Sequence, residues 1–267
     1  MEKNEILKTA KILNEATMEI REIERLTNTY PNMSLDDAYL IQDAGIAIRL
    51  ARGERQVGFK MGLTSKAKRD QMNLNTPIYG VLTDAMQVNE ETAFSLKYSI
   101  HAKIEPEIAF LISKEIKGPS SRDQIIEACS GVCAAMEILD SRFLNFKYFS
   151  LPDVVADNCS SSYFVLSHTV KKISDLELDN LEMNMKVDGE TIQKASSKEI
   201  SGNPLNSLIQ LCEMLHTRGL ALPAGSIVLA GAATQAVPLK AGTQILLTVE
   251  NLGSVGLRVG MEYERNL

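Results

Sequence analysis

The chain has 267 residues, of which 45% are hydrophobic and 23% are charged, a composition typical of a folded globular protein. The formal net charge is −6 and the Lys and Arg residues are scattered, so the sequence offers no basic face for nucleic acid. No stretch approaches the roughly 20 apolar residues that span a bilayer, and the N-terminus lacks the apolar core of a signal peptide. We therefore predict a cytoplasmic protein that binds neither nucleic acid nor membrane, with its four cysteines reduced.

The first fifth of the chain is predicted to be helical. Apolar residues recur at helical spacing from about residue 4 to 25. The sequence Ser34-Leu-Asp-Asp37 is typical of a capping box and predicts a second helix that ends near Gly53. We expect one domain, with a helical N-terminal region over about 1–55 and a β-rich body over about 56–267.

The body begins where short apolar runs alternate with Gly, Pro, Asn and Ser, a pattern that predicts strands and turns. Two helices interrupt it. One has Ser121 as N-cap and is predicted to run through DQIIEACSGVCAA; the other has Asn203 as N-cap, Pro204 as its first residue and Gly219 at its end. The predicted strands lie in QVGFKMGLTS, TPIYGVLTDAM, HAKIEPEIAFLIS, AAMEILDSR, GSIVLAGA, TQILLTVE and SVGLRV. Together these elements predict an α+β fold.

Two neighbouring carboxylates lie on one predicted strand, KIEPEIAF. Residues two apart share a strand face, so Glu105 and Glu107 project together while Ile104 faces a core. Pro106 has no N–H to donate, which places the strand at a sheet edge or beside a bulge.

A third carboxylate, Glu137, lies in the apolar run AAMEILD, where a solvated surface is not expected. Three converging carboxylates in a chain with three histidines favour an oxygen-ligated cation such as Mg²⁺ or Mn²⁺. The alternative is that Glu105 and Glu107 line a solvated face while Glu137 pairs with a core arginine such as Arg142.

Lys60 is framed by Phe59 and Met61 in GFKMGLTS. Near a dication, a partly buried lysine could stabilise an enolate or transfer a proton, because burial and neighbouring positive charge lower its pKa. The alternative is a lysine that extends to solvent or pairs with a glutamate.

Several motifs, in order and spacing, resemble the hydratase and decarboxylase family of catechol meta-cleavage pathways, in the fumarylacetoacetate hydrolase superfamily. The likeness runs from about residue 30 to the end. The motifs are GFKMGLTSKAK, NTPIYGVLTDAM, IHAKIEPEIAF, EILDSRFLNFKYF, DVVADNCSS and AGTQILLTVENLGSVGLRV.

The resemblance implies a mixed β-roll or sandwich with a helical N-terminal region, forming a single catalytic domain. It implies a divalent metal, Mg²⁺ or Mn²⁺, held by Glu105, Glu107 and Glu137, with Lys60 as the catalytic residue beside the substrate. The substrate-binding residues it implies are Met61, Leu63, Ile78 and Ser160.

Within the family, one branch hydrates 2-hydroxypenta-2,4-dienoate and the other decarboxylates 4-oxalocrotonate, a 2-oxo dicarboxylic acid. The hydratases carry an acid/base aspartate where this chain has Ile78, which cannot move a proton, so we expect the decarboxylase reaction. GNPLNS resembles the hydratases more. The sequence is also compatible with hydrolysis of an acylpyruvate, or with a non-catalytic partner subunit. Family behaviour also implies a homo-oligomer and a complex with the sister hydratase.

Overall fold

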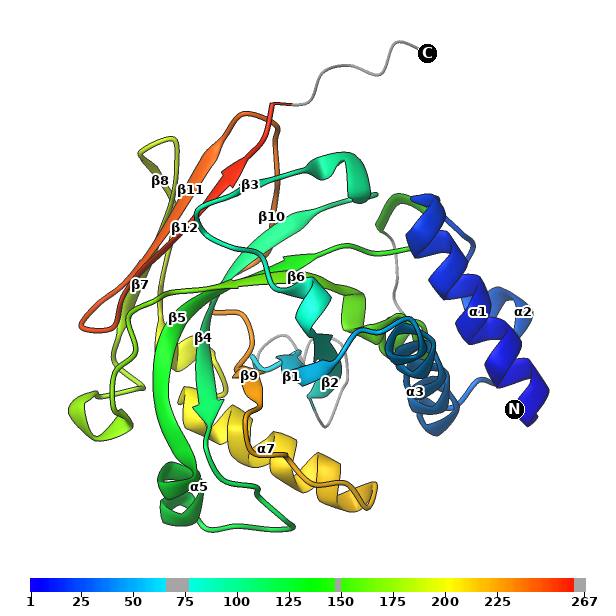
Figure 1. The fold of residues 1–267 in the computed structure, drawn as a ribbon, viewed down its shortest axis with the longest axis horizontal. Helices are drawn as coiled ribbons and strands as arrows, with labels where there is room; N and C mark the ends of the chain where they lie inside the picture. Colours follow the sequence, from blue (N-terminus) through cyan, green and yellow to red (C-terminus); the bar gives the residue numbers. More distant parts are fainter. Residues whose placement is uncertain (66–76, 147–149, 262–267) are drawn as a thin grey trace.

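Two β-sheets and a set of covering helices make up the fold (Figure 1). The computed structural model describes residues 1–65, 77–146 and 150–261; parts of three quoted motifs, at 66–68, 75–76 and 147–149, lie outside these ranges. The α-helices are α1 (Lys3–Glu19), α2 (Leu26–Thr29), α3 (Leu35–Ala51), α5 (Arg122–Ala128), α6 (Leu151–Ala156) and α7 (Pro204–Thr217). The strands are β1 (Gln56–Gly62), β2 (Ile78–Thr83), β3 (Ala93–Phe94), β4 (Lys103–Ile112), β5 (Cys129–Leu139), β6 (Ser161–Leu166), β7 (Glu182–Val187), β8 (Glu190–Ser196), β9 (Ile227–Leu229), β10 (Val237–Pro238), β11 (Gln244–Val249) and β12 (Gly253–Val259).

The larger sheet has seven strands in the order β2-β1-β9-β4-β5-β6, with β10 paired to the start of β4. The smaller sheet has five, in the order β3-β12-β11-β7-β8, and its strands β11 and β12 contact β5. In Figure 1 the smaller sheet lies at the upper left, while α1 and α3 lie together on the right. This mixture of helix and sheet confirms the predicted α+β class.

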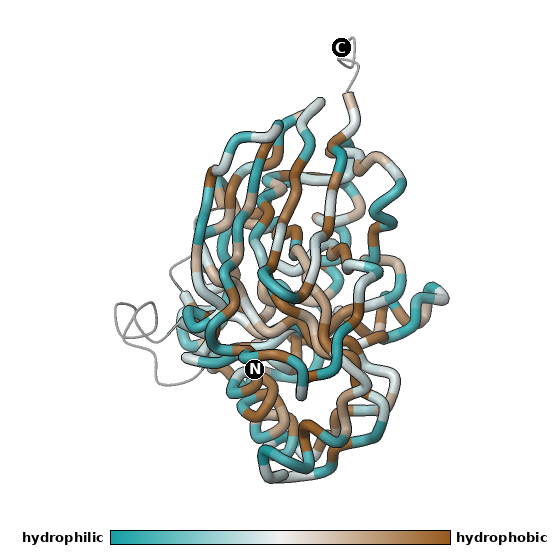
Figure 2. The backbone as a smooth tube through the Cα atoms, turned by 90° about the vertical axis from the view of Figure 1, so that its left-hand side faces the viewer, coloured by the Kyte–Doolittle hydropathy of each residue, from teal (hydrophilic) through white to brown (hydrophobic). Residues whose placement is uncertain are grey.

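The smaller sheet buries one of its faces. Hydrophobic and hydrophilic residues are interspersed along its strands (Figure 2), and in β11 the buried residues Ile245, Leu247 and Val249 alternate with exposed ones. This period of two is the pattern of a sheet with one face on a core and the other in water. No helix in the described ranges is both long and apolar enough to cross a membrane.

Side-chain caps set the helix ends that the sequence predicted. Ser34 accepts a hydrogen bond from the Asp37 backbone N–H in a capping box, and Asn203 accepts one from the Leu205 N–H at the start of α7. The first helix is shorter than predicted. Ile20 adopts a left-handed conformation that ends α1 at Glu19, and the chain continues into a bridge between Ile23 and Phe143.

The helix predicted after Ser121 is largely wrong. Ser121 does cap a helix, but α5 ends at Ala128 and the following residues form the long strand β5. From Gly131 to Leu139 every residue of β5 is buried, because β5 is covered on both faces. A strand buried on both sides is apolar without alternation, so its sequence cannot be distinguished from a buried helix by periodicity.

The predicted edge position of Pro106 is also wrong, since β4 is an interior strand between β9 and β5. The Pro106 carbonyl accepts a hydrogen bond from the Ala233 N–H, on the side away from β5. On that side β9 ends at Leu229 and β10 begins only at Val237. The missing N–H of proline therefore points to a gap in the neighbouring strand and leaves no ladder bond unmade.

A buried ion pair joins the end of β5 to the segment after α6. Arg142 donates to the side chain of Asp157 through its Nε and to the Asp157 carbonyl oxygen at 2.7 Å, and both side chains are buried. The alternative in which Arg142 pairs with Glu137 is therefore wrong. This pair fixes the turn over residues 158–160 that lies against β2.

Replacing Asp157 with asparagine should lower the free energy of unfolding by about 3 kcal/mol, because it leaves a buried guanidinium without a counter-charge. Urea denaturation at neutral pH measures this. The matched control is Asp84→Asn, which breaks a pair with the exposed Arg55 and should shift the denaturation midpoint far less, because solvent screens that pair. Equal losses in the two variants would contradict a structural role for the buried pair.

Candidate active site

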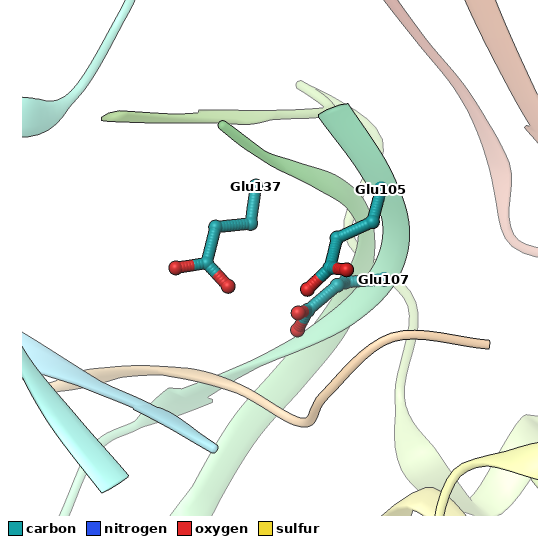
Figure 3. Close-up of side chains that lie close together, drawn as sticks. All are labelled: Glu105, Glu107 and Glu137. Atoms are coloured by element: carbon teal, nitrogen blue, oxygen red, sulfur yellow. The ribbon is translucent and has the colours of Figure 1, made fainter. Parts of the chain in front are cut away.

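Three carboxylates meet on one face of the larger sheet (Figure 3). Glu105 of β4 lies directly opposite Glu137 of β5 in the antiparallel register, and Glu107 follows two residues later on the same strand face. Oxygens of the three side chains lie within 4.8 Å of one another, and all three residues are buried. The alternative in which Glu105 and Glu107 line a solvated face is therefore excluded.

Two of the carboxylates, Glu107 and Glu137, have oxygens without a hydrogen-bond donor among the described residues. Glu107 Oε2 accepts a hydrogen bond of 2.7 Å from the Gly231 N–H, whereas Glu107 Oε1 and Glu137 Oε1 accept none within the described ranges. Burial raises the pKa of Glu107 well above its usual value, and the charges of Glu137 and Glu105 add to this rise. Buried carboxylate oxygens that converge, some of them without a donor in the described ranges, fit a hard divalent cation such as Mg²⁺ or Mn²⁺.

Lys60 of β1 contributes a positive charge to this group. Its Nζ lies 2.9 Å from Glu137 Oε2, and its side chain is 3% exposed. Burial alone would lower the pKa of Lys60, but Glu137 and the other two glutamates outweigh it and raise the pKa above the usual value. In this arrangement Lys60 is a fixed cation, contrary to the lowered pKa that the sequence suggested.

A strained turn holds the other side of Lys60. Lys60 Nζ donates to the carbonyl oxygen of Cys159 at 3.2 Å, within a turn whose residues Asn158, Cys159 and Ser160 all have positive φ. Left-handed conformations of non-glycine residues are costly, so the surrounding contacts must hold the turn in place. Asn158 does so by bonding both the N–H and the carbonyl oxygen of Val81 on β2.

Two glycines allow the close approach of backbone that this site requires. A Cβ on Gly80 of β2 would lie 2.7 Å from the Asn158 carbonyl oxygen and 3.2 Å from a carbon of the Lys60 side chain. Gly231 has φ +106°, and a Cβ there would lie 2.4 Å from Oγ1 of Thr64. A larger residue at position 80 would displace Lys60. A larger residue at position 231 would displace the backbone N–H that donates to Glu107.

A cavity of about 290 Å³ opens onto Lys60 and Glu105. This volume suits a small organic acid. Its described lining combines apolar side chains with polar and charged ones, and it includes the loop between β9 and β10 that passes Pro106. The lining includes Lys60, Ile78, Lys103, Glu105, Leu139, Phe146, Leu151 and Val154.

The four residues predicted to bind substrate are divided between the cavity and the core. Leu63 and Ile78 line the cavity, and Leu63 has a positive φ of 55°. Met61 is fully buried in the hydrophobic core, on the opposite face of β1 from Lys60. Ser160 is 1% exposed and is not among the described lining residues, so its place is in the turn behind Lys60.

Sequence reasoning missed the backbone groups of the site, namely the Cys159 carbonyl and the Gly231 N–H. A main-chain donor or acceptor has no residue type that identifies it. It also missed Lys103, although a signal was present, since Lys103 stands two residues before Glu105 on the same strand face.

The family of the chain follows from comparison with known proteins. Residues 47–260 match the family described as fumarylacetoacetate (FAA) hydrolase C-terminal. The chain belongs to the fumarylacetoacetate hydrolase family. Membership agrees with the resemblance seen in the sequence and confirms the predicted fold. Among solved structures, 4-oxalocrotonate decarboxylase from Pseudomonas putida G7, complexed with magnesium and adipate, is similar over 97% of this chain and 98% of its own, with 35% identity and a TM-score of 0.93.

Two curated relatives represent the decarboxylases and the hydratases. A 4-oxalocrotonate decarboxylase from Pseudomonas sp. is 42% identical over 231 residues, which cover 84% of this chain and 89% of the relative. A 2-hydroxyhexa-2,4-dienoate hydratase from Comamonas testosteroni is 32% identical over 249 residues, which cover 92% of this chain and 94% of the relative. The higher identity lies with the decarboxylase.

Proposed function

We propose that this protein decarboxylates 4-oxalocrotonate to 2-hydroxypenta-2,4-dienoate and CO₂. Glu105, Glu107 and Glu137 are the proposed ligands of Mg²⁺ or Mn²⁺, and Lys60 is the proposed catalytic residue. The observation that carries the proposal is the buried carboxylate triad with an ion-paired lysine, in a chain similar along almost its whole length to 4-oxalocrotonate decarboxylase.

The lining of the cavity is compatible with a dicarboxylate substrate. Adipate, found in the related decarboxylase structure, is a six-carbon dicarboxylate, and so is 4-oxalocrotonate. Lys60 and Glu105 line the cavity and connect it to the triad, and apolar side chains such as Ile78, Leu151 and Val154 also line it. These groups match a 2-oxo acid head at the triad and a hydrocarbon chain against the apolar side chains.

The metal, when bound, supplies a Lewis acid toward the 2-oxo acid group of the substrate. Lys60, which lies 2.9 Å from Glu137 Oε2, places a positive charge beside the oxygen on which negative charge develops as CO₂ leaves. The Cys159 carbonyl holds the ammonium group in that position. Ile78, Leu151 and Val154 keep water from the product dienol.

The hydratase is the second candidate, since hydratases are also among the relatives. Ile78 argues against it. Its side chain is 2% exposed and lines the cavity, where it offers no group to transfer a proton to or from water. His101, a possible base for hydrolysis of an acylpyruvate, pairs instead with Glu22 at 2.6 Å.

Purified protein with Mg²⁺ should release CO₂ from 4-oxalocrotonate, and a chelator should remove this activity. Released CO₂ and the absorbance of the dienol are followed separately. The matched substrate is 2-hydroxypenta-2,4-dienoate, which a decarboxylase should leave unhydrated. Hydration without CO₂ release would assign the chain to the hydratase branch, and metal binding without either reaction would indicate a non-catalytic partner subunit.

Three expectations accompany the proposed function. We propose that the whole chain acts as a single catalytic domain, that it forms a homo-oligomer, and that it associates with the sister hydratase in the cytoplasm. The cysteines among the described residues are free, which agrees with a reducing compartment. Light scattering on the protein alone, and then mixed with a hydratase of the family, measures both kinds of assembly.

A further inference from the structure

A second lysine, Lys103, lines the cavity at the start of β4. Its side chain lies on the same strand face as those of Glu105 and Glu107, because the three residues alternate along β4. Lys103 is the first of the three, so it lies about 6.5–7 Å along the strand from Glu105 and farther from Glu107. The cation Lys103 therefore precedes the two glutamates on this face of β4.

The charge of Lys103 is not neutralised within the described ranges. No carboxylate there lies within 4.0 Å of its Nζ, in contrast to Lys60, which is paired with Glu137. The contact of Lys103 is with an aromatic face: its Nζ lies 3.9 Å from the centroid of the Phe146 ring, and Phe146 also lines the cavity. A ring face holds an ammonium group in place and leaves its N–H donors able to bind an anion.

We propose that Lys103 binds the distal carboxylate of the substrate, the one remote from the 2-oxo acid group, and so selects dicarboxylates over monocarboxylates. The inference rests on the proposed function, which places the 2-oxo acid head of the substrate at the triad. The spacing along β4 then places Lys103 where the other end of a six-carbon chain lies. Leu139, opposite Lys103 in the register, covers the hydrocarbon between the two ends.

This assignment separates binding from catalysis. The distal carboxylate is the group that leaves as CO₂ and loses its charge, so a cation beside it interacts more strongly with the substrate than with the transition state. Lys103 is thus a specificity-determining residue, and its removal should raise KM for 4-oxalocrotonate without lowering kcat.

Calorimetric titration of the Mg²⁺-loaded protein with 2-oxoadipate and 2-oxohexanoate tests the proposal. The two ligands share the 2-oxo acid head and differ only in the distal carboxylate. The wild type should prefer 2-oxoadipate by about tenfold or more, the range of one hydrogen bond between charged groups. Lys103→Met should lose this preference because it binds 2-oxoadipate more weakly and 2-oxohexanoate as before. Lys103→Arg should retain the preference.

Lys97→Met is the matched control, because Lys97 also lies over an aromatic ring, that of Tyr98, but is not among the described lining residues. It should behave as the wild type. An unchanged preference in Lys103→Met, or no preference in the wild type, would overturn the proposal. If the protein shows a ligand preference that depends on Lys103 but releases no CO₂, the proposed carboxylate site stands and the proposed reaction is wrong.

Discussion

Replacing Glu107 with glutamine should reduce Mg²⁺-dependent CO₂ release by at least about a hundredfold, because it removes one of three converging carboxylates. Glutamine keeps the size of the side chain and can still accept the hydrogen bond from the Gly231 N–H. The fold should therefore be retained, and Mg²⁺ should no longer raise the melting temperature as it does in the wild type. Steady-state kinetics and thermal unfolding with and without Mg²⁺ measure both effects.

The same substitution should stabilise the metal-free protein, and the gain should grow with pH. The pKa of Glu107 is raised in the folded protein above its usual value of 4.5. Below pH 4.5 the carboxyl is protonated and the folded protein keeps its full stability. As pH rises through the folded pKa, this contribution to the free energy of unfolding is lost. Glutamine has no proton to lose. The melting temperature of Glu107→Gln should exceed that of the wild type by more at pH 8 than at pH 5.

Glu182→Gln is the control for both effects, since Glu182 is exposed on the smaller sheet and pairs with Lys194. It should leave activity, metal response and pH dependence unchanged. Full activity of Glu107→Gln in the presence of chelator would show that the triad is not the metal site.

Lys60→Met should lower kcat by about a hundredfold to a thousandfold, the effect of removing one preorganised charge that stabilises a developing anion. Mg²⁺ affinity should stay the same or increase, because the ammonium of Lys60 competes with the metal for Glu137. Metal-free protein should be destabilised by about 3–5 kcal/mol, since Glu137 loses its buried partner, and Mg²⁺ should restore much of this loss.

These opposite responses distinguish Lys60 from a metal ligand. Glu107→Gln should raise metal-free stability and abolish the response to Mg²⁺, whereas Lys60→Met should lower metal-free stability and enlarge that response. Lys194→Met removes an exposed lysine and is the control. If Lys60→Met retained the wild-type kcat, Lys60 would have only the structural role of neutralising Glu137.

The Glu105 and Glu107 pair was predictable because its signal is local: the two residues are spaced by the period of a strand. Glu137 stands out in an apolar run, but its convergence with the pair rested on the family resemblance. The caps Ser34 and Asn203 were also predictable from local signals, since a capping side chain bonds to backbone two or three residues away. Their positions are confirmed, whereas the roles of the site residues stay predictions until the variants are measured.

Features that depend on distant parts of the chain were not predictable. Whether Cys129 begins a strand or continues a helix is decided by the layers that cover β5 on both faces, and these come from elsewhere in the sequence. The pKa of Lys60 depends on which charges the fold brings to it. The environment of Pro106 depends on where β9 stops, more than 120 residues later.

The gap opposite Pro106 has a consequence for altering the enzyme by design. The segment between β9 and β10 lines the cavity, yet it is tied to β4 mainly through its own backbone, by the Gly231 N–H to Glu107 and the Ala233 N–H to the Pro106 carbonyl. Side chains such as those of Gln235 and Ala236 carry none of these bonds and can be exchanged while the triad keeps its geometry. A library confined to these two positions would therefore vary the accepted substrate while the catalytic groups stay in place.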